Sequence, residues 1–306
     1  VYKRQGLVSM IDRNTLLGLF AILLWSSTVA LVRSISEQIG PLAAGAAVYM
    51  TGGLLSTFSL LIKKSDIGRV RELPRAYLFG CGSLFVLYTI SLFLALGLAA
   101  NRHQTVEIGL INYLWPTLTI LFSLLILSKK ASFGLIPGTL LALFGIFLVL
   151  TQGSSISWRS FTENLLSNPI AYGLGLTAAV SWALYSNLTR RWAGPGEMGG
   201  VPLFILTTGI TLSVACLFRS ERGSYDARVI AEVIFLSLAT VSAYIFWDIA
   251  MRKGNIVLVA SCSYLTPLLS TAVSCIYLRI TPGASLWLGS LFIVAGSFLS
   301  WRSIVR

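Results

Sequence analysis

The chain has 306 residues, of which 56% are hydrophobic and only 11% are charged, and its mean hydropathy is +0.81. Soluble domains carry about a quarter charged residues, and one soluble core could not bury this much apolar surface, so the composition excludes a soluble protein and predicts an integral membrane protein. The net charge of +12 does not indicate nucleic-acid binding, because the basic residues lie between apolar stretches rather than on a soluble module.

Ten apolar stretches are each close to the roughly 20 residues that a helix needs to cross the hydrocarbon layer. They lie at 15–32, 41–62, 76–99, 106–128, 132–151, 169–189, 201–218, 230–251, 255–278 and 284–301. The longest connection, 152–168, is polar and is followed by the helix start Asn168-Pro169. We expect it to be a loop between two halves, 10–151 and 169–306. The predicted fold is all-α and integral to the membrane, with ten transmembrane helices.

The N-terminal residues 1–9 precede Met10, which we expect to be the native start. Residues 1–9 are then expected not to belong to the native protein. The first apolar stretch continues into a full span, so no cleavable signal peptide is predicted.

The basic residues predict the direction of the helices. Sixteen of the 23 Lys and Arg residues lie at the termini and in alternate loops on one side, and seven lie on the other. By the positive-inside rule, both termini are expected in the cytoplasm.

The two halves match each other in sequence, at an offset of 151 residues for their last two stretches and 157 for their first. The coincident pairs are Pro116–Pro267, Gly138–Gly289, Gly145–Gly296, Ala99–Ala250, Gly18–Gly175, Trp25–Trp182 and Arg33–Arg190. Because five is odd, the halves must enter the membrane from opposite sides. The pattern therefore predicts a 5+5 inverted repeat around a central cavity, which is typical of secondary transporters with a substrate site near the midplane.

Motifs for enzymatic or ATP-driven chemistry are absent from the sequence. There is no P-loop, GxGxxG, GxSxG or HExxH pattern. The chain has one histidine, and its four cysteines lie in apolar stretches without a CxxC pair. We expect no enzyme activity, no cofactor and no metal site.

Three carboxylates lie nearest to membrane depth, and buried carboxylates in spans are usually functional. Glu232 lies where it would favour a helix N-terminus, and Asp248 precedes Arg252 by four residues and would pair with it. Glu107, with the nearby His103, is the best candidate for a coupling role, with a structural role as the alternative. The middle of the bundle is expected to be uncharged, which argues against the multidrug type of ion exchange.

The fourth and ninth stretches each contain a proline near the middle. The neighbouring polar and aromatic residues are Asn112, Tyr113 and Trp115 before Pro116, and Ser263 and Tyr264 before Pro267. A proline leaves a helical carbonyl without its partner, and such a group in lipid must be satisfied by protein or water. Two matching prolines predict broken helices at a binding site, with static packing kinks as an equal alternative.

Aromatic and polar side chains share one face of the sixth stretch, at Trp182, Tyr185 and Ser186. Related positions in the first, third and eighth stretches are Trp25, Tyr88 and Tyr244. An interfacial belt explains Trp287 and Trp301 well, but it explains these mid-stretch rings less well. Because buried hydroxyls need partners, the pattern indicates water in a central cavity.

These residues also resemble a known family. Trp25-Ser26-Ser27, the run Asn-Tyr-Leu-Trp-Pro at 112–116 and the 5+5 organisation resemble the drug/metabolite transporter superfamily of the EamA type. Residues 103–116, HQTVEIGLINYLWP, together with 24–33, are similar to its aromatic amino-acid exporter branch, the YddG type. The resemblance covers the chain from Met10 onward.

The resemblance implies a multi-pass protein of the bacterial inner membrane, made of two EamA-type halves, that exports neutral and often aromatic amino acids by alternating access. It implies a cavity lined by Trp25, Tyr88, Tyr113, Trp115, Trp182, Tyr185 and Tyr244, to which we add Asn112, Ser186, Ser263 and Tyr264 as candidates. The expected partners are amino acids and the lipid bilayer, and we expect a monomer. The alternatives are an exporter of drugs or another small metabolite and, more remotely, a membrane scaffold or enzyme.

Overall fold

The computed structural model describes residues 12–62, 64–151, 158–194, 199–218, 223–278 and 283–305. Residues 1–9, which we expected not to belong to the native protein, lie outside the described residues. So does the first part of the 152–168 connection.

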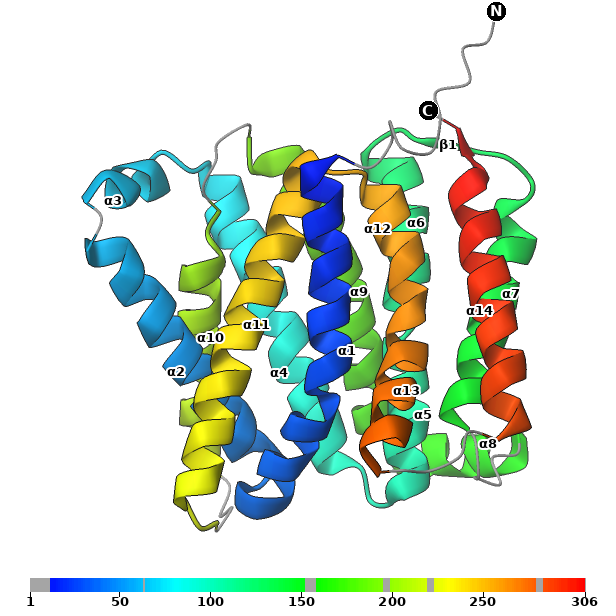
Figure 1. The fold of residues 1–306 in the computed structure, drawn as a ribbon, viewed down its shortest axis with the longest axis horizontal. Helices are drawn as coiled ribbons and strands as arrows, with labels where there is room; N and C mark the ends of the chain where they lie inside the picture. The colour runs from blue at the N-terminus through cyan, green and yellow to red at the C-terminus, as the bar shows by residue number, and fades with distance from the viewer. Residues whose placement is uncertain are drawn as a thin grey trace, which may run out of the picture.

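The described chain is almost entirely helical, and it forms an elongated bundle (Figure 1). The helices are α1 (Arg13–Ile39), α2 (Pro41–Ile62), α3 (Lys64–Arg71), the π-helical η2 (Ala76–Cys81), α4 (Gly82–Leu98), α5 (Arg102–Asn112), α6 (Trp115–Ile126), α7 (Leu135–Leu150), α8 (Trp158–Ser167), α9 (Pro169–Trp192), α10 (Val201–Cys216), α11 (Ala227–Lys253), α12 (Ile256–Cys262), the 3-10 turn η3 (Ser263–Leu265), α13 (Thr266–Leu278) and α14 (Ala284–Arg302). Two short strands, β1 (Lys130–Ala131) and β2 (Ile304–Val305), pair antiparallel.

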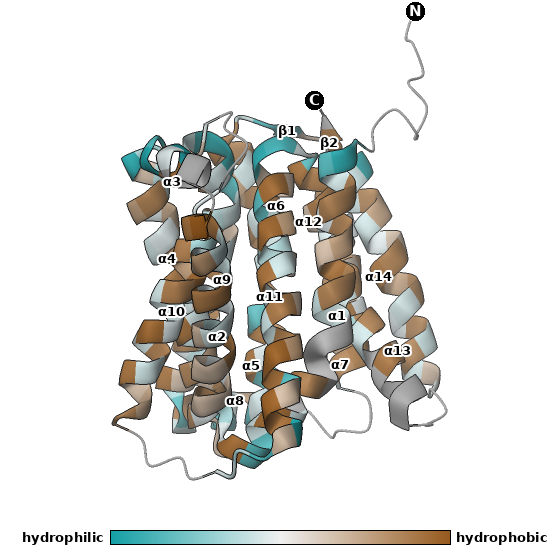
Figure 2. Cartoon of the chain, turned by 60° about the vertical axis from the view of Figure 1, so that its left-hand side comes forward, coloured by the Kyte–Doolittle hydropathy of each residue, from teal (hydrophilic) through white to brown (hydrophobic). Residues whose placement is uncertain are grey.

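Five helical segments are long and apolar enough to cross a membrane, and shorter apolar helices accompany them. The five are 41–62, 76–98, 103–126, 227–253 and 284–302. Figure 2 shows hydrophobic residues along the length of the bundle and hydrophilic residues gathered towards its ends. Large apolar side chains such as Phe58, Phe79 and Leu125 are exposed on the outside, where lipid would cover them. The chain is therefore a multi-pass helical membrane protein.

Asp and Asn side chains begin several of these helices. Each accepts a hydrogen bond from the backbone N–H three residues later, which satisfies one of the donors that a helix leaves free in its first turn. The capping residues are Asp12 for α1, Asn101 for α5, Asn168 for α9, Asp226 for α11 and Asn255 for α12. These caps place the helix starts near the bundle ends.

The two ends of the bundle differ. We call the end at which α1 begins and α14 finishes the terminal face; it also holds α3 and the β1–β2 pair (Figure 1). The opposite face holds α8, which forms within the connection that we expected to be a loop. The helix is stabilised by the exposed pair Arg159–Glu163 at i,i+4, and its residues Phe161 and Leu165 pack against the cluster containing Tyr172.

Two of the apolar stretches are interrupted. The helix is broken at Tyr113 and Leu114 between α5 and α6, and by η3 between α12 and α13. Pro116 and Pro267 occupy the first turn of the helix that follows each interruption, where their missing N–H groups cost nothing. Both prolines are buried. The interruptions therefore lie inside the bundle rather than against lipid.

Four helix pairs make the largest contacts: α1 with α11, α4 with α9, α2 with α10 and α7 with α14. The α7–α14 pair depends on small residues. A Cβ atom at Gly145 would lie 2.7 Å from the Gly289 carbonyl oxygen, and one at Gly296 would lie 2.6 Å from the Gly138 carbonyl oxygen. The two backbones therefore meet directly, as small residues permit in membrane helices.

We predict that Gly296→Ala destabilises the protein. Its methyl group would overlap the backbone of α7 at Gly138 and Ala142, at a cost of about 1–3 kcal/mol. Gly173→Ala is the matched control, because nothing lies within 4 Å of its Cβ position, and it should be neutral or stabilising by about 0.5–1 kcal/mol. Thermal unfolding in detergent compares the two, and equal effects would contradict a close α7–α14 contact.

Candidate functional site

Eight aromatic side chains meet where α1, α4, α6, α9 and α11 converge. Trp182 lies at their centre, and its ring centroid is 4.7 to 6.2 Å from those of seven others. We call this group the aromatic cluster: Trp25, Phe85, Tyr88, Trp115, Trp182, Tyr185, Tyr244 and Trp247. Each such pair contributes about 0.5–1.5 kcal/mol beyond the burial of its area. The rings hold five helices together, and they contact one another at the centre where we expected a cavity.

Some polar atoms of the cluster have hydrogen-bond partners. The hydroxyls of Tyr49 and Tyr244 are hydrogen-bonded at 2.6 Å, and Trp247 Nε1 donates to Ser186 Oγ at 3.2 Å. Trp25 and Tyr88 are only half-buried, whereas Trp182 and Tyr185 are buried. The cluster is therefore accessible from the side of Trp25 and Tyr88.

The candidate residues at the helix interruptions lie at the end of α5 and in η3. Asn112 ends α5, and its buried Oδ1 has no hydrogen-bond partner. Tyr113 is half-buried and packs on the hydrophobic cluster that involves α7 and α14. Ser263 and Tyr264 form part of η3; Ser263 Oγ donates to the Ala260 carbonyl, and the Tyr264 hydroxyl bonds to Thr117 at 2.8 Å.

Tyr264 belongs to the same hydrophobic cluster as Tyr113, and no ring contact joins either to the aromatic cluster among the described residues. The structure thus brings together Trp25, Tyr88, Trp115, Trp182, Tyr185 and Tyr244, with Ser186 beside them. Tyr113 and Tyr264 pack instead on the hydrophobic cluster that contains residues of α7 and α14.

A buried ion pair lies beside the aromatic cluster, one helical turn from Tyr244. Arg252 Nε donates to Asp248 Oδ2 at 2.7 Å, and the side chains are only 1% and 2% exposed. Tyr77 donates its hydroxyl to Asp248 Oδ1 at 2.7 Å, and Tyr185 lies 3.4 Å from the same oxygen. The expected Asp248–Arg252 pair exists near the end of α11, and it is almost completely buried, which the sequence did not predict.

The physical reason is that Asp248 is covered from several sides. The Gly200 N–H donates to Tyr77 at 3.0 Å, so the start of α10 closes over the pair. Gly199 lies so close to the Asp248 carboxylate that a Cβ atom there would collide with it. The network therefore connects η2, α9, α10 and α11 on the terminal side of the aromatic cluster.

The other two candidate carboxylates, Glu107 and Glu232, lie towards the opposite face. Glu107 is buried and accepts hydrogen bonds from the Tyr172 hydroxyl and from Asn164 Nδ2. His103 is exposed. Glu232 accepts from Arg228 and Ser34 at the start of α11. None of these is in the aromatic cluster, and among the described residues no group of three His, Cys, Asp or Glu side chains could hold a metal ion.

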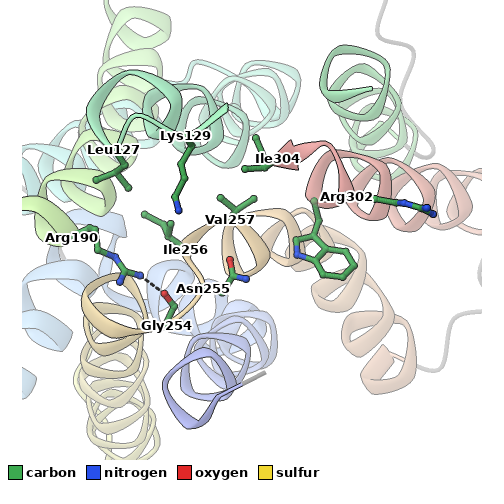
Figure 3. A pocket seen from close by; sticks show the side chains of 10 residues that line it. Leu127, Lys129, Arg190, Gly254, Asn255, Ile256, Val257, Arg302 and Ile304 are labelled. Atoms are coloured by element: carbon green, nitrogen blue, oxygen red, sulfur yellow. Dashed lines mark hydrogen bonds between the residues drawn. The ribbon is translucent and has the colours of Figure 1, made fainter. Parts of the chain in front are cut away.

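A pocket of about 660 Å³ opens at the terminal face (Figure 3). It lies between the ends of α6 and α9, the start of α12 and the end of α14. Its lining residues are Leu127, Lys129, Arg190, Gly254, Asn255, Ile256, Val257, Trp301, Arg302 and Ile304. The sequence analysis did not predict this site.

Three residues of the central site were missed from the candidate list: Tyr49, Phe85 and Trp247. Trp247 and Phe85 were detectable in principle, because they lie three residues from Tyr244 and Tyr88 and so share their helix faces. No such spacing signal pointed to Tyr49, because its place in the site depends on the hydrogen bond from α2 to Tyr244 on α11.

The sequence pattern of the EamA-like transporter family matches residues 13–151 and, again, residues 169–302. The chain belongs to the EamA-like transporter family. Membership indicates a transporter rather than an enzyme, and it confirms the EamA-type resemblance.

Individual EamA-like relatives are similar over nearly the whole chain. The aromatic amino acid exporter YddG of Escherichia coli is 36% identical, over 96% of this chain and 99% of the relative. The protein of the same name from Ancylobacter novellus is 31% identical, over 92% and 95%. A solved crystal structure with 27% identity covers 94% of this chain and 97% of its own, with a TM-score of 0.79. The YddG-like resemblance is thereby confirmed.

We predict that Asp248→Asn strongly destabilises the protein. The change leaves the Arg252 guanidinium buried without its counter-charge, at a cost of about 3–5 kcal/mol. Glu163→Gln is the matched control, because Arg159–Glu163 has the same i,i+4 spacing but side chains that are 89% and 63% exposed. It should cost less than about 1 kcal/mol. Thermal unfolding of both variants in detergent tests this, and a mild effect of Asp248→Asn would contradict the buried network.

Proposed function

We propose that this chain is a secondary transporter of the inner membrane that exports neutral amino acids, aromatic ones among them, by alternating access. The observation that carries the proposal is the aromatic cluster around Trp182, at the meeting point of five helices. Relatives named as aromatic amino acid exporters, 36% and 35% identical, support the substrate class. The recurring match of the family pattern in each half supports two EamA-type units.

The proposed architecture is a 5+5 inverted repeat of ten transmembrane segments. The segments are α1, α2, η2–α4, α5–α6, α7, α9, α10, α11, α12–α13 and α14. The helix contacts support a pseudo-two-fold relation, because α1 packs on α11 as α9 packs on α4. The fixed pairs α2–α10 and α7–α14 join equivalent helices of the two halves.

Contacts of individual glycines also support the pseudo-two-fold relation between the halves. Gly18 on α1 packs against Val259, and its counterpart Gly175 on α9 packs against Ile108. Val259 and Ile108 are themselves 151 residues apart, the offset at which the halves match in sequence. This agreement between sequence offset and packing supports antiparallel halves. Most of the Lys and Arg side chains in the described part of the chain lie towards the terminal face, which under the positive-inside rule supports cytoplasmic termini.

The chemistry of the cluster suits a zwitterion with an apolar side chain. The rings of Trp25 and Tyr88, which are half-buried, can part to admit a substrate side chain and stack on it. Outside the cluster, three residues before Trp115 in the chain, Asn112 has a buried Oδ1 without a partner, and it is the proposed acceptor for a substrate ammonium group. Because a neutral amino acid has no net charge, such dipoles can hold its ends without a full counter-charge.

Proteoliposomes that contain the purified protein test the proposal. We expect time-dependent uptake of labelled phenylalanine, and the alternative substrate class is tested in parallel with paraquat-like cations. Transport of the cations without any amino acid would replace this proposal with drug export.

Trp182→Ala is expected to reduce phenylalanine transport at least about tenfold, since it removes the ring that contacts seven others and each lost aromatic contact weakens the site by about 0.5–1.5 kcal/mol. Trp287→Ala is the matched control, because Trp287 is 67% exposed on the outside of α14 and should keep near-normal flux. Both variants must elute as single species in detergent. Equal rates in the two variants would move the substrate site away from Trp182.

A further inference from the structure

The pocket at the terminal face combines a free positive charge with apolar walls. Lys129 follows α6 and directs its ammonium group towards Ile256 and Val257, across the pocket (Figure 3). The Lys129 side chain is half-buried, and within the described chain its ammonium has no hydrogen-bond or ion-pair partner. None of the ten lining residues is acidic. The pocket therefore presents an unpaired cation to whatever enters it.

The other two cations of the pocket are already engaged or turned away. Arg190 donates to the Gly254 carbonyl oxygen, which ties the end of α9 to the turn between α11 and α12. The Arg302 side chain points away from the other residues in Figure 3. Lys129 is thus the charge that remains for a ligand.

The rest of the lining is apolar. Leu127, Ile256, Val257 and Ile304 form the walls near Lys129, and Trp301 adds an aromatic ring. The pairing of β1 with β2 fixes this wall, because it holds the loop after Lys129 against the end of the chain. A cation beside such walls matches an oxyanion carried on an apolar body.

The pocket and the aromatic cluster share two helices. Leu127 lies twelve residues beyond Trp115, which is about 18 Å along a helix, and Arg190 lies eight beyond Trp182. Between the two levels, Asn187 Nδ2 donates to the Thr119 carbonyl and joins α9 to α6.

Buried acceptors without partners lie at this intermediate level. Asn187 Oδ1 is one, and Ser261 Oγ on α12 is another. Such groups are costly in a dry interior. They offer hydrogen-bond acceptors between the pocket and the aromatic cluster.

We propose that this pocket is the entrance of the export path and binds the carboxylate of the amino acid through Lys129 before the substrate reaches the aromatic cluster. The inference rests on the proposed function and adds a separate site to it. The Lys129 ammonium takes the carboxylate, and the apolar walls with Trp301 take the side chain. A phospholipid headgroup offers the same chemistry, an oxyanion on an apolar body, so the experiment must separate these two sources.

The test uses the purified full-length chain in detergent with a thiol reporter, Ile304→Cys, at a half-buried position in the pocket wall. Its modification by an uncharged maleimide is followed by mass spectrometry of the peptide that contains residue 304. L-Phenylalanine should slow the modification, whereas L-phenylalaninamide, which has no carboxylate, should not.

Adding Lys129→Gln should raise the phenylalanine concentration needed for protection about tenfold, the equivalent of one charge-assisted hydrogen bond. Lys130→Gln is the matched control, because Lys130 is exposed and outside the pocket lining. In proteoliposomes without the reporter, Lys129→Gln should raise KM for phenylalanine and leave the maximal rate near that of the parent protein.

Each outcome has a distinct meaning. Protection that is equal for the acid and the amide, or unchanged by Lys129→Gln, overturns the carboxylate site. Protection by added phosphatidylglycerol but not by phenylalanine assigns the pocket to lipid and overturns it as well. Transport without protection refutes the site and leaves the proposed export standing, whereas protection without transport supports the site and refutes export.

Discussion

The bundle depends on the rule that no backbone or polar group can be left to the lipid, which offers no hydrogen bonds. Breaking a helix in the membrane is tolerated only where other protein groups surround the break. Here the prolines that follow both interruptions are buried, and at the second interruption Ser26 on α1 approaches the Thr266 carbonyl at 3.4 Å.

The Asp248–Arg252 pair connects this interior to the terminal face. A buried ion pair contributes little net stability, but removing one partner is costly, so the groups around it are held in one arrangement. Tyr77, Tyr185 and the start of α10 all converge on Asp248. Tyr185 is also a member of the aromatic cluster. Tyr185 therefore connects the aromatic cluster to the Asp248 network, in which η2, α9, α10 and α11 meet on the terminal side.

Much of the fold was predictable because the lipid imposes a strong length and composition signal. Every predicted apolar stretch is helical, in part or throughout, over its described residues. The face that carries Trp182 and Tyr185 followed from helical spacing alone. Residue spacing along one helix does not predict which helices lie close together. Tyr264 lies three residues before Pro267, which matches Pro116 in the other half, and we expected it in the central cavity. It packs instead against Thr117 and the hydrophobic cluster with residues of α7 and α14. The burial of Asp248 could not be predicted, because it depends on Gly199 and Gly200, which a hydropathy profile does not place over it.

The division of charge between the two sites has a mechanistic consequence. A transport site must bind well enough to be occupied and weakly enough to release. A full charge in the desolvated aromatic cluster would interact with a substrate carboxylate far more strongly than one near water, because the effective dielectric constant falls with burial. Lys129 is half-buried at the mouth, where water screens it, while the cation nearest the cluster, Arg252, is neutralised by Asp248. In the proposed export path, this arrangement lets the charge attract a carboxylate at the entrance and leaves dipoles and rings to hold the substrate in the centre.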